Sequence, residues 1–182
     1  LLSGSDTEFD GSIQFARNTI TVATRQEHHG LEDTSPVTCI LSELPEYTTL
    51  KKVIDDFEHT VNPSNAKMNA YSDALEQFSS LGYYEVEESI LRELATYQIG
   101  EDKARGKLGS LSGGQKRFVE LVKIAHSKAD LALIDEPTNH MDYVAKDAFI
   151  AWLKTIGTMS ALIITHDRDV LAEVDRIIEI KD

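Results

Sequence analysis

The feature that most constrains this chain is a pair of short apolar runs that each end directly in polar side chains. The run LALI at 131–134 is followed by Asp135 and Glu136, and ALIIT at 161–165 is followed by His166. A helical pattern separates the two runs, and such alternation of apolar strands with a helix predicts a buried, mostly parallel sheet. Because parallel sheets gather functional side chains at the carboxyl ends of their strands, we expect these three residues to line one edge of an α/β fold.

Further strands are predicted on both sides of this pair. The β-branched stretch TITVAT at 19–24 predicts a strand, and Gln26 comes soon after it, which places Gln26 at the same edge. Residues 11–15 are expected to form an edge strand, and residues 177–180 a last strand. The predicted sheet thus draws on both ends of the chain.

The middle of the chain changes to a helical pattern. Apolar residues recur at spacings of three and four within 50–61, 68–78 and 86–97, which predicts three helices. Pro36 behind Ser35 predicts the start of a shorter helix. These helices are interpreted as a small subdomain inserted into the α/β fold.

A second polar motif, LSGGQ, begins at Leu111. Ser112 is expected to cap a helix over about 114–127. Gly113 and Gly114 let backbone N–H groups approach an anion at the positive end of that helix. A plain capped turn remains the alternative interpretation of these residues taken alone.

The adjacent carboxylates Asp135 and Glu136 also suggest a ligand. Two acids that close an apolar strand are costly unless a cation lies nearby, and Mg²⁺ bound to phosphates would serve. Asp135 would hold the metal, and Glu136, which points elsewhere, would polarise an attacking water. An ordinary acidic turn is the alternative.

Composition limits the class of protein. A net charge of −13 argues against a surface that binds nucleic acid over its whole extent, although residues 103–128 hold seven Lys and Arg and one acid, Glu120. The single cysteine, Cys39, excludes an intramolecular disulfide and fits a reducing compartment, so a cytoplasmic location is expected. No apolar run is long enough to span a membrane.

The chain carries LSGGQ, a basic helix, DEPTNHMD and then THD. In this order and at these spacings, the motifs closely resemble those of the ATP-binding cassette (ABC) ATPases. The resemblance covers essentially the whole chain and implies a P-loop NTPase-like core with a mostly parallel sheet. It implies that residues 1–30 and 127–182 form the core, and that residues 31–126 form a helical subdomain ending in the LSGGQ helix.

The resemblance also implies a role for each motif, with ATP and Mg²⁺ as ligands and a second cassette as partner. Ser112, Gly113, Gly114 and Gln115 would bind the nucleotide of the partner cassette, and Asp142 would help couple the two sites. Asp135 and Gln26 would position Mg²⁺, Glu136 would activate water, and His166 would contact the γ-phosphate.

The string DEPTNHMD at 135–142 is similar to the DEPTNHLD of the ABC-F branch, whereas transporter cassettes usually read DEPTS or DEPTA. Residues 71–94 and the THDRDVL at 165–171 also resemble that branch, although Asp169 and Val170 replace its usual aromatic pair. ABC-F members act mostly on ribosomes, so an ATPase working in translation, with the ribosome or RNA as partner, is expected. The ATP-binding subunit of a membrane transporter, paired with a transmembrane subunit, and a degenerate non-hydrolysing cassette remain the alternatives.

One family motif is missing. No GxxGxGK[ST] string, the Walker A P-loop, occurs in the 182 residues. The opening stretch at 1–13 resembles the family's segment just beyond the P-loop helix, so the chain is expected to be part of a longer protein; a naturally degenerate cassette and an engineered deletion are the alternatives. Alone, the chain is expected to bind ATP poorly and to expose apolar sheet surface.

Overall fold

The computed structural model describes residues 10–25, 28–139, 141–157 and 159–180. The contacts divide the chain into two compact units. One unit, called here the sheet unit, comprises Leu1–His28 and Ser112–Asp182, and the other, the helical unit, comprises His29–Leu111. Each unit has buried apolar side chains of its own.

The sheet unit holds a parallel sheet of three strands in the described residues, in the order β1 (Thr21–Ala23), β2 (Leu131–Asp135) and β3 (Ser160–Ile164). The register pairs Leu133 with Ala23 on one side and with Leu162 on the other. This confirms the predicted α/β fold with parallel strands, and it brings the carboxyl ends of all three strands to one edge.

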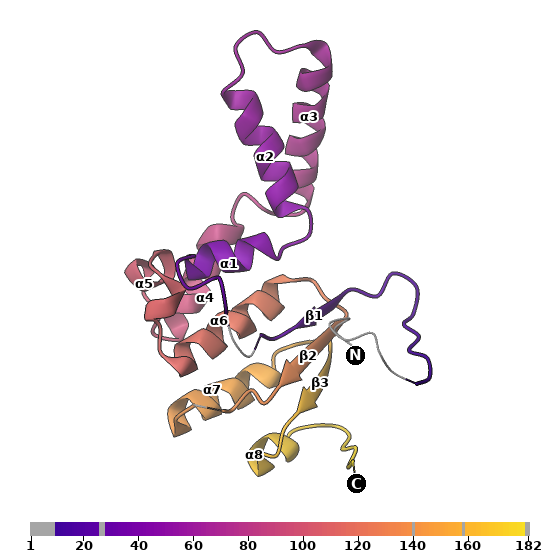
Figure 1. The fold of residues 1–182 in the computed structure, drawn as a ribbon, viewed down its shortest axis with the longest axis vertical. Helices are drawn as coiled ribbons and strands as arrows, with labels where there is room; N and C mark the ends of the chain where they lie inside the picture. Colours follow the sequence, from indigo (N-terminus) through magenta and orange to yellow (C-terminus); the bar gives the residue numbers. More distant parts are fainter. Residues whose placement is uncertain (1–9, 26–27, 140, 158, 181–182) are drawn as a thin grey trace. The chain divides into compact units, whose positions relative to one another are not determined.

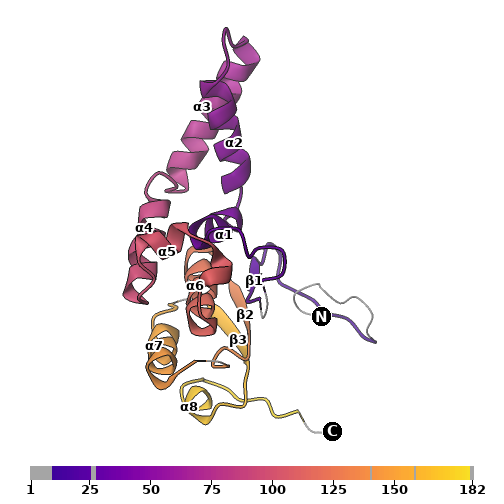
Figure 2. The ribbon, with the colours of Figure 1, turned by 60° about the vertical axis from the view of Figure 1, so that its left-hand side comes forward.

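Three helices belong to the same unit: α6 (Gly113–His126), α7 (Tyr143–Leu153) and the short α8 (Arg168–Leu171). Figures 1 and 2 both place α6 and α7 on the same side of the sheet. Ala132 and Ile134 of β2 and Phe149 of α7 are buried. The core of this unit therefore lies between one face of the sheet and these helices.

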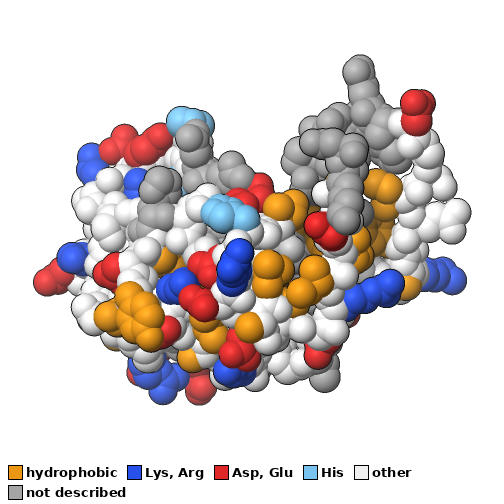
Figure 3. Space-filling model, turned by 90° about the horizontal axis from the view of Figure 1, so that it is seen from below, with side chains coloured by type: hydrophobic (Ala, Val, Ile, Leu, Met, Phe, Trp, Pro, Cys, Tyr) orange, Lys and Arg blue, Asp and Glu red, His pale blue; other side chains and the backbone are white. Residues whose placement is uncertain are grey.

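The other face of the sheet is open in the described part of the chain. Leu162 is 39% exposed and Ile164 is 61% exposed, although parallel strands are usually covered on both faces. Figure 3 shows hydrophobic side chains in patches on the surface seen from below. The exposed apolar surface matches the expectation, whereas the prediction of a buried sheet is wrong for β3.

Two predicted strands are not formed. Residues 11–15 and 177–180 have irregular backbone, and their large apolar side chains are exposed, among them Phe15 at 46% and Ile180 at 92%. A strand needs a neighbouring backbone to satisfy its N–H and C=O groups. Within the described residues neither run lies on the ladder of the sheet, so its apolar pattern has nothing to pair with.

The helix that starts at LSGGQ also differs from expectation. We expected it to end the helical subdomain of residues 31–126, but α6 belongs to the sheet unit. Its apolar face is buried, including Val119 and Val122, and Lys123 Nζ donates a hydrogen bond of 3.0 Å to the carbonyl oxygen of Ala23 in β1. Packing against the sheet therefore decides where this helix belongs.

The helical unit confirms the predicted helices. Its elements are α1 (Pro36–Ser42), α2 (Tyr47–Glu58), α3 (Asn65–Ser80), α4 (Val86–Thr96), α5 (Glu101–Arg105) and the 3-10 turn η1 (Leu108–Ser110). Ser35 caps α1 by accepting the N–H of Thr38, as predicted. Helices α2 and α3 run side by side as a hairpin in Figure 1, and α1 packs against α2, α4 and α5.

An aromatic cluster closes the base of this hairpin. The ring of Tyr47 lies 5.5 Å from that of Phe78 and 5.3 Å from that of Tyr83, measured between centroids. Tyr83 is buried, and its hydroxyl donates a hydrogen bond of 2.6 Å to the carbonyl oxygen of Pro45. Burial raises the pKa of Tyr83, with a smaller contribution from the charge of Glu46, so the hydroxyl keeps its proton at neutral pH.

We expect Tyr83→Phe to lower the free energy of unfolding by about 1–2 kcal/mol, because the carbonyl of Pro45 loses its donor inside the protein. Urea denaturation followed by circular dichroism measures the change. Tyr84→Phe is the matched control, since Tyr84 is 62% exposed, and it should change stability by less than about 0.5 kcal/mol. Equal effects of the two variants would contradict the assigned role of the Tyr83 hydroxyl.

Candidate functional site

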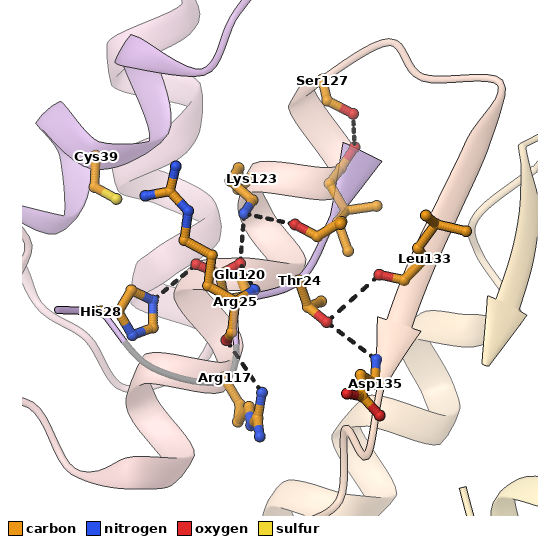
Figure 4. Close-up of polar contacts among 12 residues, drawn as sticks. Thr24, Arg25, His28, Cys39, Arg117, Glu120, Lys123, Ser127, Leu133 and Asp135 are labelled. Atoms are coloured by element: carbon orange, nitrogen blue, oxygen red, sulfur yellow. Dashed lines mark hydrogen bonds and ion pairs between the residues drawn. The ribbon is translucent and has the colours of Figure 1, made fainter. Parts of the chain in front are cut away.

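Backbone hydrogen bonds join the carboxyl ends of the three strands. The N–H of Thr24, next after β1, donates to the carbonyl oxygen of Leu133 at 2.9 Å. The N–H of Asp135 donates to Thr24 Oγ1 at 3.1 Å (Figure 4). The N–H of Glu136 donates to the carbonyl oxygen of Ile164 at 2.8 Å. Asp135 and Glu136 are thus held between the ends of the two outer strands.

Glu136 has the least usual environment of these residues. Its φ is +42°, a left-handed conformation that costs a residue with a side chain on the order of 1–3 kcal/mol. One carboxylate oxygen, Oε1, lies 2.9 Å from His166 Nδ1. The other, Oε2, is buried and has no hydrogen-bond partner among the described residues, a situation that costs about 1–3 kcal/mol. The site is therefore built around an acceptor that lacks a donor in the part of the chain that the structure describes.

His166 reaches Glu136 from the end of β3. Its side chain is 79% exposed, so it touches both the carboxylate and solvent. The hydrogen bond to Glu136 raises the pKa of His166 above its ordinary value of 6.5, and the negative charge of Glu136 adds to this effect. The structure therefore brings together Asp135, Glu136 and His166, which the sequence placed at one edge.

The turn that carries His166 is held by its neighbours. Asp167 caps α8 by accepting the N–H of Asp169 at 3.0 Å, and Lys146 of α7 lies 3.4 Å from Asp167 and also pairs with Asp169. Burial raises the pKa of Asp167, but the N–H of Asp169, the Thr138 side chain and Lys146 together outweigh it and lower that pKa. Asp167 is therefore ionised and fixed beside His166.

The LSGGQ turn forms the N-terminus of α6. Ser112 Oγ accepts the N–H of Gln115 at 3.2 Å, and Gln115 Oε1 accepts the N–H of Ser112 at 3.3 Å, which is a complete capping box. Gly113 and Gly114 are the first two residues of the helix. The predicted cap is confirmed, and it leaves a helix start without bulky side chains at its positive end.

Asp142 and Gln26 are the remaining predicted site residues. Asp142 caps α7, because its Oδ1 accepts the N–H of Ala145 at 2.8 Å. Gln26 lies outside the described residues. Sequence reasoning missed Thr24, whose hydroxyl contacts the N–H of Asp135; the clue was a hydroxyl side chain at the end of a predicted strand.

The carboxylates suit a metal that is mostly held by other ligands. Within the part of the chain that the structure describes, no group of three or more His, Cys, Asp and Glu side chains is placed to bind a metal ion. Mg²⁺ does not need such a group, because one or two carboxylates and the phosphates of a substrate satisfy it. Asp135 at its strand end fits this requirement.

Comparison with known proteins decides the family. A family model described as "ABC transporter" matches residues 1–139, the larger part of the chain. The chain belongs to the ABC transporter family. Members of this ABC family are ATPases. No helix among the described residues combines the length and apolar character needed to cross a membrane.

Curated relatives fall into two groups. Elongation factor 3 of Mycosarcoma maydis is 39% identical over 80 residues, which are 43% of this chain and 8% of that protein. ATP-binding protein Uup of Escherichia coli is 29% identical over 175 residues, which are 94% of this chain and 27% of that protein. Both are ABC-F proteins. MacB of Photorhabdus laumondii, a macrolide export ATP-binding/permease protein, is 36% identical over 84 residues, which are 45% of this chain and 13% of that protein. The chain thus spans less than a third of these relatives.

Solved structures confirm the fold of the ABC ATPases. A metal-chelate type ABC transporter in an inward-facing conformation superposes with a TM-score of 0.58 at 19% identity, over 95% of this chain and 58% of that one. A dimeric ATP-binding cassette in a post-hydrolysis state, bound to ADP and Pi, superposes with a TM-score of 0.51 at 20% identity. The match covers 85% of this chain and 56% of that one. At such identities the similarity establishes the fold alone.

The His166–Glu136 contact predicts a titration. We expect the pKa of His166 to lie above 6.5, and Glu136→Gln to lower it, since the hydrogen bond to a charged carboxylate is lost. This contact should stabilise the folded protein fully at pH values below the pKa that His166 has in the unfolded chain. The stabilisation should disappear as the pH rises through the higher pKa that His166 has in the folded protein. NMR titration of the imidazole measures the pKa of His166 in the wild-type protein and in Glu136→Gln. An unchanged pKa in the variant would contradict the contact.

Proposed function

We propose that this chain provides the catalytic carboxylates of an ATPase that hydrolyses ATP between two ABC cassettes. The observation that carries the proposal is the buried Oε2 of Glu136, which has no hydrogen-bond partner among the described residues and lies next to Asp135 at the ends of parallel strands. A buried acceptor with no donor favours the binding of a water molecule there. The same carboxylate can then accept that water's proton during attack on a phosphate.

Each neighbour of Glu136 has a role in this proposal. His166 holds Oε1 and so directs Oε2 to the water, while its exposed ring reaches the phosphate side. Asp135 and Gln26 hold Mg²⁺, which neutralises charge on the phosphates. Thr24 fixes the backbone of Asp135. Catalysis then consists of positioning and electrostatic stabilisation.

The start of α6 serves the other cassette. Ser112, Gly113, Gly114 and Gln115 present a small, positively polarised helix terminus, which favours the phosphates of a nucleotide held by the partner cassette. Asp142 begins α7 and is proposed to couple the two sites. Because Glu136 and the LSGGQ turn serve different nucleotides, the reaction needs two cassettes in contact.

We further propose that the protein is an ABC-F ATPase that acts on the ribosome in the cytoplasm. Two observations support this: relatives of this chain include elongation factor 3 and Uup, and residues 135–142 read DEPTNHMD. A transporter cassette is the second candidate, because MacB relatives match the chain as well. The two candidates differ in the partner of the cassette and share the reaction.

Glu136→Gln should trap ATP in the complete protein. Steady-state hydrolysis is expected to fall about 100-fold or more, while ATP stays bound, because the neutral amide cannot accept the proton of the attacking water. Phosphate release and the retention of radiolabelled ATP on a desalting column measure the two effects.

Glu173→Gln is the matched control for this variant. Glu173 pairs with Lys154 and has no role in the proposed chemistry, so this variant should keep normal turnover. Normal turnover in Glu136→Gln would refute the assignment of Glu136 as the base.

The trapped variant also separates the two candidate partners. With ATP, the complete Glu136→Gln protein should co-sediment with ribosomes through a sucrose cushion, and ADP should reduce this, since only ATP favours closed cassettes. Recovery with membranes and a transmembrane subunit instead would favour the transporter.

A further inference from the structure

One face of α6 carries polar side chains that the proposed chemistry does not use. Arg117, Glu120 and Lys123 recur every three residues, so they lie along one side of the helix. Figure 4 shows all three close to the stretch directly after β1. Glu120 is 1% exposed and Lys123 is 2% exposed, which makes them a buried ion pair on the helix that LSGGQ begins.

This ion pair holds the chain on both sides of Thr24. Lys123 Nζ donates to the carbonyl oxygen of Ala23 at 3.0 Å, and Glu120 Oε2 accepts the N–H of Arg25 at 2.8 Å. The second carboxylate oxygen of Glu120, Oε1, lies 2.8 Å from Nε2 of the buried His28. A fourth contact, from Arg117 Nη1 to the carbonyl oxygen of Arg25, measures 3.3 Å. The backbone end of β1 is thus anchored to α6 by side chains.

Glu120 is charged in this setting. Burial alone raises the pKa of Glu120, but the hydrogen bond from His28, the charge and hydrogen bond of Lys123 and the N–H of Arg25 together lower it below its usual value. A buried ion pair of this kind seldom stabilises a fold more than well-packed apolar side chains of the same size. Its burial on α6 is therefore weak evidence for a stabilising role alone, and its contacts have to show what else it does.

The anchored stretch leads directly to the carboxylate edge. Between Ala23 and Arg25 lies Thr24, whose Oγ1 accepts the N–H of Asp135 at 3.1 Å and whose N–H donates to Leu133. A displacement of residues 23–25 would therefore move the backbone of Asp135. Contacts thus run without interruption from α6 through Thr24 to Asp135.

We propose that Glu120 and Lys123 are positioning residues that fix Asp135 through Thr24, and so tie the metal-binding edge to the helix that starts at LSGGQ. The role deepens the proposed function, on which it rests, because it assigns Asp135 to Mg²⁺. Side chains that orient a metal ligand typically change metal affinity about 10- to 100-fold when they are lost. Glu120 and Lys123 are expected to act in this range.

Two double variants of the complete protein test the proposal. Both carry Lys123→Met, and they differ only in Glu120→Leu or Glu120→Gln. Both remove the charges, but only glutamine keeps a carbonyl oxygen that can accept the N–H of Arg25. We expect the leucine variant to bind ATP about tenfold more weakly with Mg²⁺ and within about twofold of wild type in EDTA. The glutamine variant, which lacks the bond from Lys123 to Ala23 but keeps an acceptor for Arg25, should show a clearly smaller loss of affinity with Mg²⁺. A fluorescent ATP analogue measures both affinities.

A second readout needs no nucleotide. In the leucine variant, hydrogen exchange should accelerate at the amides of Arg25 and Asp135, and it should accelerate clearly less in the glutamine variant. Identical Mg²⁺ responses and identical exchange in the two variants would overturn the proposal.

Val122→Ala, a buried apolar change on the same helix, controls for a general loss of stability. This variant should bind ATP in the presence of Mg²⁺ as tightly as wild type. A loss of affinity equal to that of the leucine variant would show that stability alone is responsible, and it would overturn the positioning role of Glu120 and Lys123. A wild-type protein that binds no ATP would refute the proposed function, and the exchange data would still decide whether Glu120 holds Asp135.

Discussion

The parallel pairing of three short strands is the constraint on which the candidate site depends. Because β1, β2 and β3 run in one direction, their last residues meet at one edge, and side chains from distant parts of the sequence become neighbours. The hydroxyl of Thr24 and the carbonyl of Ile164 then hold the backbone of Asp135 and Glu136 from both sides. Without this ladder the two acids would form an ordinary exposed turn.

The sequence predicted the parts that local patterns determine. Apolar runs followed by polar residues located β2 and β3 and placed Asp135, Glu136 and His166 together, since each strand end is determined by its own few residues. The helices of the helical unit were predicted for the same reason. The cap at Ser112 was readable because a capping box occupies only four residues.

Features that depend on distant partners were not predictable. The runs at 11–15 and 177–180 read as strands, but a strand also requires a neighbour, which sequence patterns do not supply. The place of α6 in the sheet unit depends on Lys123 meeting Ala23, 100 residues away in the chain. Likewise, the unpaired oxygen and left-handed backbone of Glu136 arise only once His166 and the third strand are in place.

The capping box of α6 has a consequence for how firmly two cassettes would adhere. Ser112 and Gln115 already satisfy each other's backbone N–H groups, so two of the donors at this helix start are taken without any ligand. The first-turn N–H groups of Gly113 and Gly114 are the ones left for an incoming phosphate, so the net gain is smaller than for a bare helix terminus. Under the proposed function, the capping box therefore keeps this turn in shape both when the cassettes are closed and after they separate.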